Sequence, residues 1–216
     1  VHQKDDKGDL VTNIDLEIEK YLIREINENY PNFDIVSEEF NSKNKMTDNC
    51  FIIDPIDGTV NFANGLPLWG IQIACRKNGK TIASIIDLPK LNEFYYADGT
   101  GAYLNDKKIS VREVPIKNAL YAMTGHNAIN TIAKMHSYSR NHRTLGASSV
   151  EFAFVASGKM HGYNYRSEKS WNYEPGLFLC KMAGAKTKSK PGFHAAAMNQ
   201  EFLDILEKET ALSDLS

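Results

Sequence analysis

The sequence lacks several features that would point to particular classes of protein. Its longest apolar runs are far too short to span a bilayer, and its net charge of −2 gives no electrostatic attraction to nucleic acid or to an anionic membrane. It has no internal repeat, no low-complexity tract and no histidines at metal-ligand spacing. No basic segment followed by an apolar one opens the chain, so we expect a cytoplasmic protein with neither a membrane nor nucleic acid as partner.

Cysteine is also scarce. Cys50, Cys75 and Cys180 are odd in number, widely spaced and each set among apolar residues. This pattern predicts buried free thiols in a reducing compartment. What is present is typical of a globular protein, with 42% hydrophobic and 24% charged residues. A chain of 216 residues is long enough for one sizeable core, or for two small lobes that share a cleft.

The most informative stretch is residues 50–62, CFIIDPIDGTVNF. The apolar run Cys50–Ile53 predicts a buried strand, and Asp54 and Asp57 then fall where we expect the strand to end and the chain to turn. Two carboxylates, a glycine that allows close approach of an anion and the hydroxyl of Thr59 are the parts of a metal-assisted phosphatase. On spacing alone, the alternative is an Asp-rich turn, which proline and glycine favour in any protein.

Acidic residues also occur at two places before this stretch. Residues 12–30 have the form of a capping box, which includes Asp15, followed by an amphipathic helix. Residues 33–36 predict a short strand that leads to Glu38 and Glu39. Helix capping accounts for the first carboxylate and a solvated loop for the other two. They become functional candidates only if the fold brings them beside the central aspartates.

The remaining pattern predicts two halves of different character. After a short helix at 60–63, strands are expected at 69–76, 81–88, 93–97 and 108–112, with a hairpin turn at Asn78-Gly79. Strands at 119–124, 142–145 and 161–165 then alternate with helices at 128–136, 146–157 and 170–184, and the lysines from Lys181 to Lys190 indicate a solvated loop. We therefore expect an α+β lobe with a mostly antiparallel sheet over residues 1–115, which holds the acidic motifs. An α/β lobe over residues 116–216 would complete the site.

Residues 54–62 resemble the signature of the inositol monophosphatase family of Mg²⁺-dependent, lithium-sensitive phosphatases, and four other stretches agree with that family in order and spacing. These are Asp9-Leu-Val-Thr-x-x-Asp15 with Lys4 ahead of it, the pair Glu38-Glu39, Gly99-Thr-Gly-Ala-Tyr-Leu-Asn105, and Trp171-Asn172 with Gly176 followed by Ala183-Gly184. The resemblance covers nearly the whole chain. It favours function over capping or turn formation for the acidic residues in these motifs.

The resemblance implies a layered α-β-α-β-α sandwich of the inositol monophosphatase and fructose-1,6-bisphosphatase type, usually a homodimer. It implies hydrolysis of a small phosphorylated metabolite with two or three Mg²⁺ ions per site. Glu38, Asp54 and the carbonyl of Ile56 would hold a first metal ion. Asp54 and Asp57 would hold a second, together with Asn172.

The resemblance also implies roles in catalysis and in substrate binding. Thr59, hydrogen-bonded to Asp15, would orient the attacking water, and Glu38 would help to take its proton. The backbone amides of Gly58 and Thr59 would bind the phosphate. Further substrate contacts would come from Lys4, Ser148 and Tyr165.

Three positions depart from the pattern of the family. Asn172 stands where the family has a metal-binding Asp, so that site loses one negative charge, although an Asn carbonyl still binds Mg²⁺. Asn172 is alternatively a helix N-cap, with Glu174 as a substitute ligand. Tyr165 replaces a Glu that bonds sugar hydroxyls, and Ala147 replaces a small hydroxyl residue.

These departures leave the substrate open. Inositol monophosphate is the default, and a sugar bisphosphate, 3′-phosphoadenosine phosphate or the 2′-phosphate of NADP are alternatives. A non-catalytic relative that binds a phosphorylated ligand is the competing hypothesis from a different class of protein.

Overall fold

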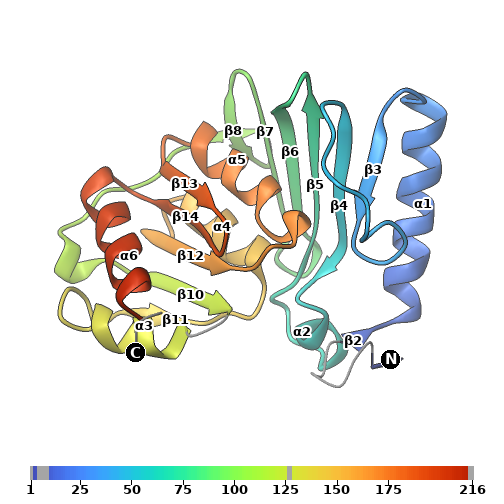
Figure 1. The fold of residues 1–216 in the computed structure, drawn as a ribbon. Helices are drawn as coiled ribbons and strands as arrows, with labels where there is room; N and C mark the ends of the chain where they lie inside the picture. The colour runs from blue at the N-terminus through green and yellow to red at the C-terminus, as the bar shows by residue number, and fades with distance from the viewer. Residues whose placement is uncertain (1, 4–9, 126–127, 214–216) are drawn as a thin grey trace.

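The fold has five layers, shown in Figure 1, in a computed structural model that describes residues 2–3, 10–125 and 128–213. Helix α1 (Asn13–Asn29) covers the outer face of a seven-stranded sheet. Helices α4 (Ser148–Ala156) and α5 (Glu174–Met182) lie between this sheet and a five-stranded one. Helices α3 (Ala128–Met135) and α6 (Gln200–Ser213) cover the outer face of the second sheet. The layers follow the α-β-α-β-α order expected from the sequence.

The seven-stranded sheet has its strands in sequence order and is antiparallel except for the first pair, which is parallel. Its strands are β3 (Asp34–Ser37), β4 (Cys50–Asp57), β5 (Gly70–Lys77), β6 (Lys80–Leu88), β7 (Glu93–Asp98), β8 (Gly101–Leu104) and β9 (Lys107–Ile109). The predicted hairpin turn is confirmed: Asn78 and Gly79 join β5 to β6, and both have positive φ, at 52° and 73°. Strand β8 was not predicted from the sequence.

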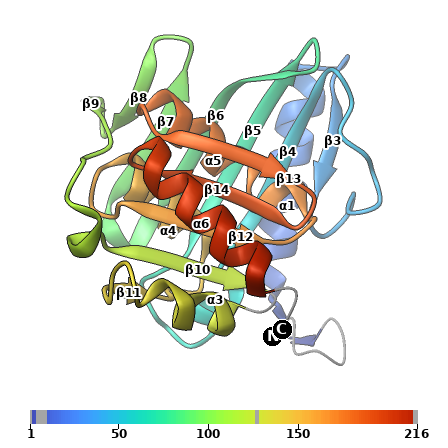
Figure 2. The same cartoon turned by 60° about the vertical axis from the view of Figure 1, so that its left-hand side comes forward.

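The five-stranded sheet has the order β11-β10-β12-β14-β13 and mixes parallel and antiparallel pairs. Its strands are β10 (Tyr121–Gly125), β11 (His142–Arg143), β12 (Gly162–Arg166), β13 (Lys186–Lys190) and β14 (Phe193–Ala197). The expectation that the lysine-rich segment is a loop is therefore wrong. The segment forms the edge strand β13, where lysines discourage pairing with another chain. Figure 2 shows α6 lying across this sheet.

Short elements complete the chain. They are strands β1 (His2–Gln3) and β2 (Leu10–Val11), helix α2 (Thr59–Ala63), and the 3-10 helices η1 (Pro89–Leu91), η2 (Ile116–Asn118) and η3 (Ser170–Asn172). Among the described residues, no helix is long and apolar enough to cross a membrane. The division of the chain into lobes at residue 115 stays a prediction.

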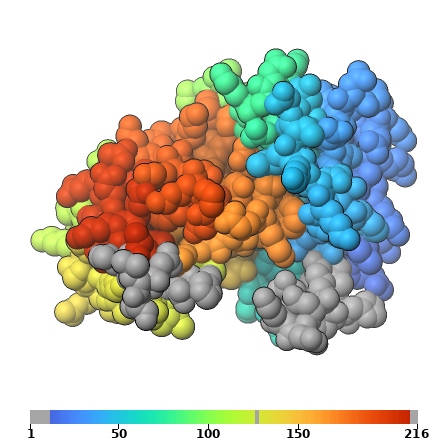
Figure 3. Space-filling view, viewed as in Figure 1, coloured from blue at the N-terminus to red at the C-terminus, as the bar shows by residue number. Residues whose placement is uncertain are grey.

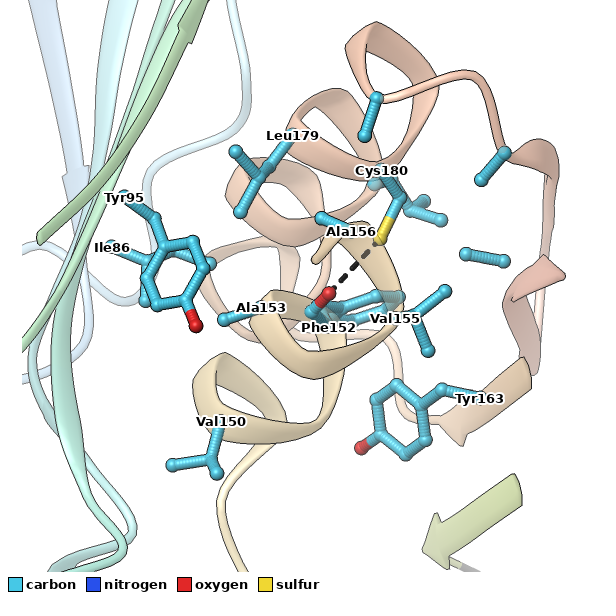
Figure 4. Packing of buried hydrophobic residues seen from close by; sticks show 14 of the residues in the cluster. Ile86, Tyr95, Val150, Phe152, Ala153, Val155, Ala156, Tyr163, Leu179 and Cys180 are labelled. Atoms are coloured by element: carbon cyan, nitrogen blue, oxygen red, sulfur yellow. Dashed lines mark hydrogen bonds between the residues drawn. The ribbon is translucent and has the colours of Figure 1, made fainter. Parts of the chain in front are cut away.

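The main core lies between the two sheets, around α4 and α5 (Figure 4). Nearly every side chain of α4 is buried, because this helix packs against both sheets and against α5. A Cβ atom at Gly176 would lie 2.3 Å from the Phe152 ring, so glycine is needed where α5 approaches α4. The thiol of Cys180 donates to the Phe152 carbonyl at 3.2 Å.

The three cysteines are free thiols, as predicted. Cys50 and Cys180 are buried, as expected, whereas Cys75 is only half-buried.

Candidate metal and phosphate site

A β-bulge sets the positions of the two central aspartates. Strand β4 continues through Asp57, so the expectation that it ends before Asp54 is wrong. Asp54 lies opposite Gln72 and Asp57 lies opposite Gly70, which leaves one extra residue on β4 between these pairs. Pro55 falls in this extra length, where its missing N–H costs no ladder hydrogen bond. The bulge lets both carboxylates line the same pocket.

The pocket has a volume of about 310 Å³ and gathers most of the residues singled out in the sequence. Those that line it are Glu38, Asp54, Ile56, Asp57, Gly58, Thr59, Tyr165 and Asn172. Figure 3 shows that early and late parts of the chain lie side by side, where the light-blue surface adjoins the orange one. A second pocket is also lined by both parts of the chain, including Met46 from the early part and Trp171 from the late part.

Asp54 is fully buried and incompletely bonded. Its Oδ2 accepts a long hydrogen bond from Gln72 Nε2 at 3.4 Å, and its Oδ1 has no hydrogen-bond donor. Burial raises the pKa of Asp54 well above its usual range, and the nearby charges of Glu38 and Asp57 raise it further. The carboxylates of Glu38, Asp54 and Asp57 thus lie close together, and Asp54 Oδ1 accepts no hydrogen bond. A bound cation would stabilise this arrangement.

Asp57 is held firmly from the start of α4. One carboxylate oxygen accepts from the Ser149 backbone N–H at 2.6 Å and from the Ser149 hydroxyl at 2.5 Å, and the other accepts from the Ser148 hydroxyl at 3.1 Å. Burial raises the pKa of Asp57 to about 6, although these hydrogen bonds oppose the shift. Ser148, expected at the substrate, is itself buried behind Asp57 and does not line the pocket.

Glu38 is positioned by a buried glutamate on α1. Glu19 accepts hydrogen bonds from the Ser37 hydroxyl at 2.5 Å, from the Glu39 N–H at 2.9 Å and from the Phe40 N–H at 2.8 Å. These bonds fix the turn after β3 and therefore the backbone on either side of Glu38. Sequence reasoning missed Glu19, although a carboxylate on the buried face of an amphipathic helix is unusual enough to mark it.

The turn from β4 into α2 brings backbone close to the pocket. Gly58 has a φ of +86°, and a Cβ atom there would lie 2.8 Å from the Ala147 Cβ. Glycine is therefore required both by conformation and by space. The Thr59 hydroxyl donates to the Ile56 carbonyl at 3.0 Å, and that carbonyl keeps a second lone pair.

Besides Ser148, Asp15 is a predicted site residue that does not line the pocket. Asp15 is buried and closes the capping box of α1 with Thr12, whose N–H donates to it at 3.0 Å and whose hydroxyl also donates to it. Within the described part of the chain, Asp15 makes no hydrogen bond to Thr59, contrary to expectation, and it does not line the pocket. Lys4 lies outside the described residues.

Asn172 and Tyr165, two departures from the family pattern, contact each other. Asn172 Nδ2 donates to the Tyr165 hydroxyl at 2.7 Å. Burial and the charge of Asp57 raise the pKa of Tyr165, so its hydroxyl stays protonated. The N-cap of α5 is Tyr173, so the alternative of Asn172 as the helix cap is wrong.

Glu174 does not reach the pocket. Its carboxylate pairs with Arg76 at 3.0 Å and accepts from the Thr81 hydroxyl. It lines a different pocket, so the alternative of Glu174 as a substitute metal ligand is also wrong.

The pocket contains further polar residues that sequence reasoning missed. Arg166, at the end of β12, and Ser167 and Lys169, just after it, line the pocket beside the predicted residues. Gln72 and Ser149 support the two aspartates from behind. The available signal was a glutamine within the apolar run from Ile71 to Cys75; Gln72 is fully buried there, opposite Asp54.

The donor set fits a divalent cation of the Mg²⁺ type. Carboxylate, carbonyl and amide oxygens are the ligands that such ions prefer, and Asp54 Oδ1 is a buried acceptor with no donor. Across the described ranges, no three His, Cys, Asp or Glu side chains are grouped closely enough to hold an ion by themselves. Ile56, through its backbone carbonyl, and Asn172 line the same pocket and could add neutral oxygen ligands. Fold and pocket thus define a layered α/β protein whose acidic site suits divalent cations.

Comparison with known proteins agrees with this class. The family model described as the inositol monophosphatase family matches residues 1–203. The fructose-1,6-bisphosphatase/inositol-1-monophosphatase of Thermotoga maritima is 32% identical over 207 residues, which cover 94% of this chain and 80% of that protein. The Nus factor SuhB of Escherichia coli K12 is 31% identical over 201 residues, covering 87% of this chain and 74% of the relative. This chain belongs to the inositol monophosphatase family.

Solved structures show the same fold. The Thermotoga maritima IMPase superposes with a TM-score of 0.89 at 27% identity, covering 98% of this chain and 88% of the other. An IMPase/NADP phosphatase complexed with Mg²⁺ and phosphate has a TM-score of 0.85 at 21% identity, covering 95% and 84%. The layered fold expected from the sequence is therefore confirmed, and structures of this fold bind Mg²⁺.

Proposed function

We propose that this chain hydrolyses a phosphate monoester of a small metabolite, with Mg²⁺ as cofactor and inositol monophosphate as the default substrate. The observation that carries the proposal is the convergence of Glu38, Asp54 and Asp57 on one pocket, with Asp54 Oδ1 buried and undonated. Such a site is costly for a metal-free protein, because like charges repel and buried carboxylates are poorly solvated. Membership of the inositol monophosphatase family supports the interpretation that these carboxylates bind cations for phosphate hydrolysis.

Each acidic residue has a distinct place in this proposal. Glu38, Asp54 and the Ile56 carbonyl would hold one Mg²⁺, and Asp54, Asp57 and Asn172 would hold a second. Bound cations supply positive charge to a phosphoryl group and acidify a water molecule. Ser149 and Gln72 keep the two aspartates in orientation, so that their oxygens need little rearrangement on binding.

Residues around Gly58 would handle the phosphate and the water. The Gly58 and Thr59 amides, at the start of α2, would donate to phosphate oxygens. The Thr59 hydroxyl would orient the water, and Glu38 would accept its proton. Asp15 would contribute by closing the first turn of α1, the helix whose Glu19 bonds the backbone after Glu38.

The substrate class follows from relatives and from the pocket wall. One relative is named for both fructose-1,6-bisphosphate and inositol-1-phosphate chemistry, and a solved structure of the fold is complexed with NADP and Ca²⁺. Arg166 and Lys169 line this pocket and supply positive charge beyond the acidic residues. Sugar bisphosphates and nucleotide phosphates therefore belong beside inositol phosphates among the substrates to test. We also propose that the chain forms a homodimer.

The direct test is phosphate release from phosphorylated inositols, sugars and nucleotides, with and without Mg²⁺. We expect Mg²⁺-dependent turnover of at least one of them, inhibited by Li⁺. Folded, Mg²⁺-supplied protein with no turnover above background on every compound would contradict the proposal.

The competing proposal is a relative that binds a phosphorylated ligand without turnover, and Asn172 is the feature that favours it. The variant Asn172→Asp separates the two, because it restores one negative charge at the second cation. A large gain in turnover favours the competing proposal for the native chain. Little change shows that the asparagine is accommodated in an active enzyme.

A further inference from the structure

The contact between Asn172 and Tyr165 joins two positions at which this chain departs from its family. Asn172 ends the short helix η3, and Tyr165 lies near the end of β12. Both line the acidic pocket, and the Asn172 amide nitrogen donates to the Tyr165 hydroxyl at 2.7 Å. Within the described residues this is the single hydrogen bond of the Asn172 side chain. The two departures therefore form one unit.

The Asn172 backbone is held in place independently of this bond. Its N–H donates to the Lys169 carbonyl at 3.1 Å. The preceding Trp171 is buried against Cys50 and Ile52 of β4, which carries the central aspartates, and against Ala74 of the neighbouring β5. Side-chain rotation is therefore the freedom that the Tyr165 hydroxyl restricts.

An asparagine can act as a ligand in one orientation only. The amide oxygen and nitrogen are nearly equal in size, but the oxygen is an acceptor and the NH₂ group carries partial positive charge. An NH₂ group turned toward a cation would repel it. In the observed arrangement the Asn172 amide nitrogen donates to the Tyr165 hydroxyl, and the Asn172 amide oxygen is left for another partner.

We propose that Tyr165 is a positioning residue for Asn172: by accepting a hydrogen bond from the amide nitrogen, it leaves the amide oxygen as a neutral ligand for the second divalent cation. This inference rests on the proposed function, because the pocket must bind cations. The tyrosine at this position then compensates for the lost aspartate. An aspartate has two equivalent oxygens and needs no such partner.

The test is a calorimetric titration of the metal-stripped protein with Mg²⁺. We expect two binding events for the native chain. Tyr165→Phe removes only the hydroxyl, and should weaken the weaker event by about tenfold or more, as is usual when a partner of a metal ligand is lost. The stronger event should be unchanged, since Tyr165 does not support its ligands.

The matched control is Tyr163→Phe, the same substitution two residues earlier on β12. The Tyr163 hydroxyl bonds Thr124 at 2.5 Å and does not line the pocket. This variant should titrate like the native chain. Equal weakening by both variants would mean a general effect on the fold, and would contradict the proposal.

The second arm repeats Tyr165→Phe in the Asn172→Asp background. The effect on Mg²⁺ affinity should be much smaller there, because a carboxylate presents an oxygen in either orientation. The same loss in both backgrounds, or no loss in the native background, would overturn the proposal. A native chain with a single binding event that Tyr165→Phe leaves unchanged would also overturn it.

Phosphate release measured on the same samples separates this inference from the proposed function. The expected Mg²⁺ pattern without turnover on any compound would keep the role of Tyr165 and reject the phosphatase. Turnover together with Mg²⁺ binding that does not depend on Tyr165 would keep the phosphatase and reject the role of Tyr165.

Discussion

At the scale of single residues, the site depends on two aspartates, Asp54 and Asp57. Asp54 and Asp57 are both buried, yet their surroundings differ. Asp57 accepts three hydrogen bonds, whereas Asp54 has one long bond and an undonated oxygen. We infer that Asp57 is oriented by the protein itself and that Asp54 is completed by a bound cation.

Gly58 gives a prediction at this scale. Gly58→Ala forces a side chain into left-handed backbone and places its Cβ 2.8 Å from the Ala147 Cβ. We expect a loss of about 1–3 kcal/mol in the free energy of unfolding, measured by urea denaturation, and a strong loss of phosphate release.

Gly65→Ala is the matched control. It has a similar φ of +75° but nothing within 4 Å of the added Cβ, so it keeps the backbone strain without the clash. A stability loss from Gly58→Ala no larger than that from Gly65→Ala would contradict the close packing of Gly58 on Ala147.

At the scale of elements, sequence patterns predicted most helices and strands, but strands β8, β13 and β14 and helix α6 were not predicted. The apolar runs of β4 to β6 and the Asn78-Gly79 turn follow rules of alternation and turn chemistry. Strand β13 does not, because its residues KTKSK are polar and its pairing comes from β14 alone. The available signal was the Pro191-Gly192 turn, which joins β13 directly to its antiparallel partner β14.

The candidate site shows the same limit. Motif resemblance found the residues on β4 and α2, because they are contiguous in sequence. It did not find Glu19, Gln72 and Ser149, which support the site from three separate elements. The bulge in β4 was also missed, since it depends on the register with β5.

Helix α4 supplies the prediction at this scale. Glu151, in its first turn, is fully buried, and its Oε1 accepts from the Leu145 N–H at 2.8 Å, next to Gly146 of the pocket wall. Burial raises the pKa of Glu151 to about 8. The folded state therefore holds a proton that the unfolded chain releases near pH 4.5, and stability must fall as pH rises between these values.

The variant Glu151→Gln removes this titration. We expect the native chain to lose several kcal/mol more than the variant in the free energy of unfolding between pH 5 and pH 8.5, since each pKa unit corresponds to about 1.4 kcal/mol. Urea denaturation of both proteins without metal measures the difference. Parallel pH profiles for the two proteins would show that Glu151 is ionised in the folded state.

At the scale of the whole molecule, the pocket lies where distant parts of the chain meet. Glu38 follows β3 of the seven-stranded sheet, whereas Tyr165 belongs to β12 of the five-stranded one. A cation in this pocket would therefore lie between residues of the two sheets. Binding to the folded state alone stabilises it by mass action.

Mg²⁺ should raise the thermal midpoint of unfolding. At one hundred times the dissociation constant, a single bound ion adds about 2.7 kcal/mol. For a chain of this size we expect an increase of about 5–10 °C in the midpoint, measured by scanning calorimetry. Asp54→Asn should abolish the increase. It should leave the metal-free protein at least as stable as the native one, because the variant replaces a fully buried carboxyl group that lies close to two other carboxylates.

The central claim is that these carboxylates form the cation site of a phosphatase, and phosphate release in Mg²⁺ by the native chain and by Asp54→Asn tests it most directly. Asp87→Asn, the same substitution on β6 outside the pocket, is the control. We predict Mg²⁺-dependent release by the native chain and by Asp87→Asn, and a loss of at least a hundredfold, about 2.7 kcal/mol, for Asp54→Asn. Equal release by all three proteins, or release that does not depend on Mg²⁺, would contradict the account.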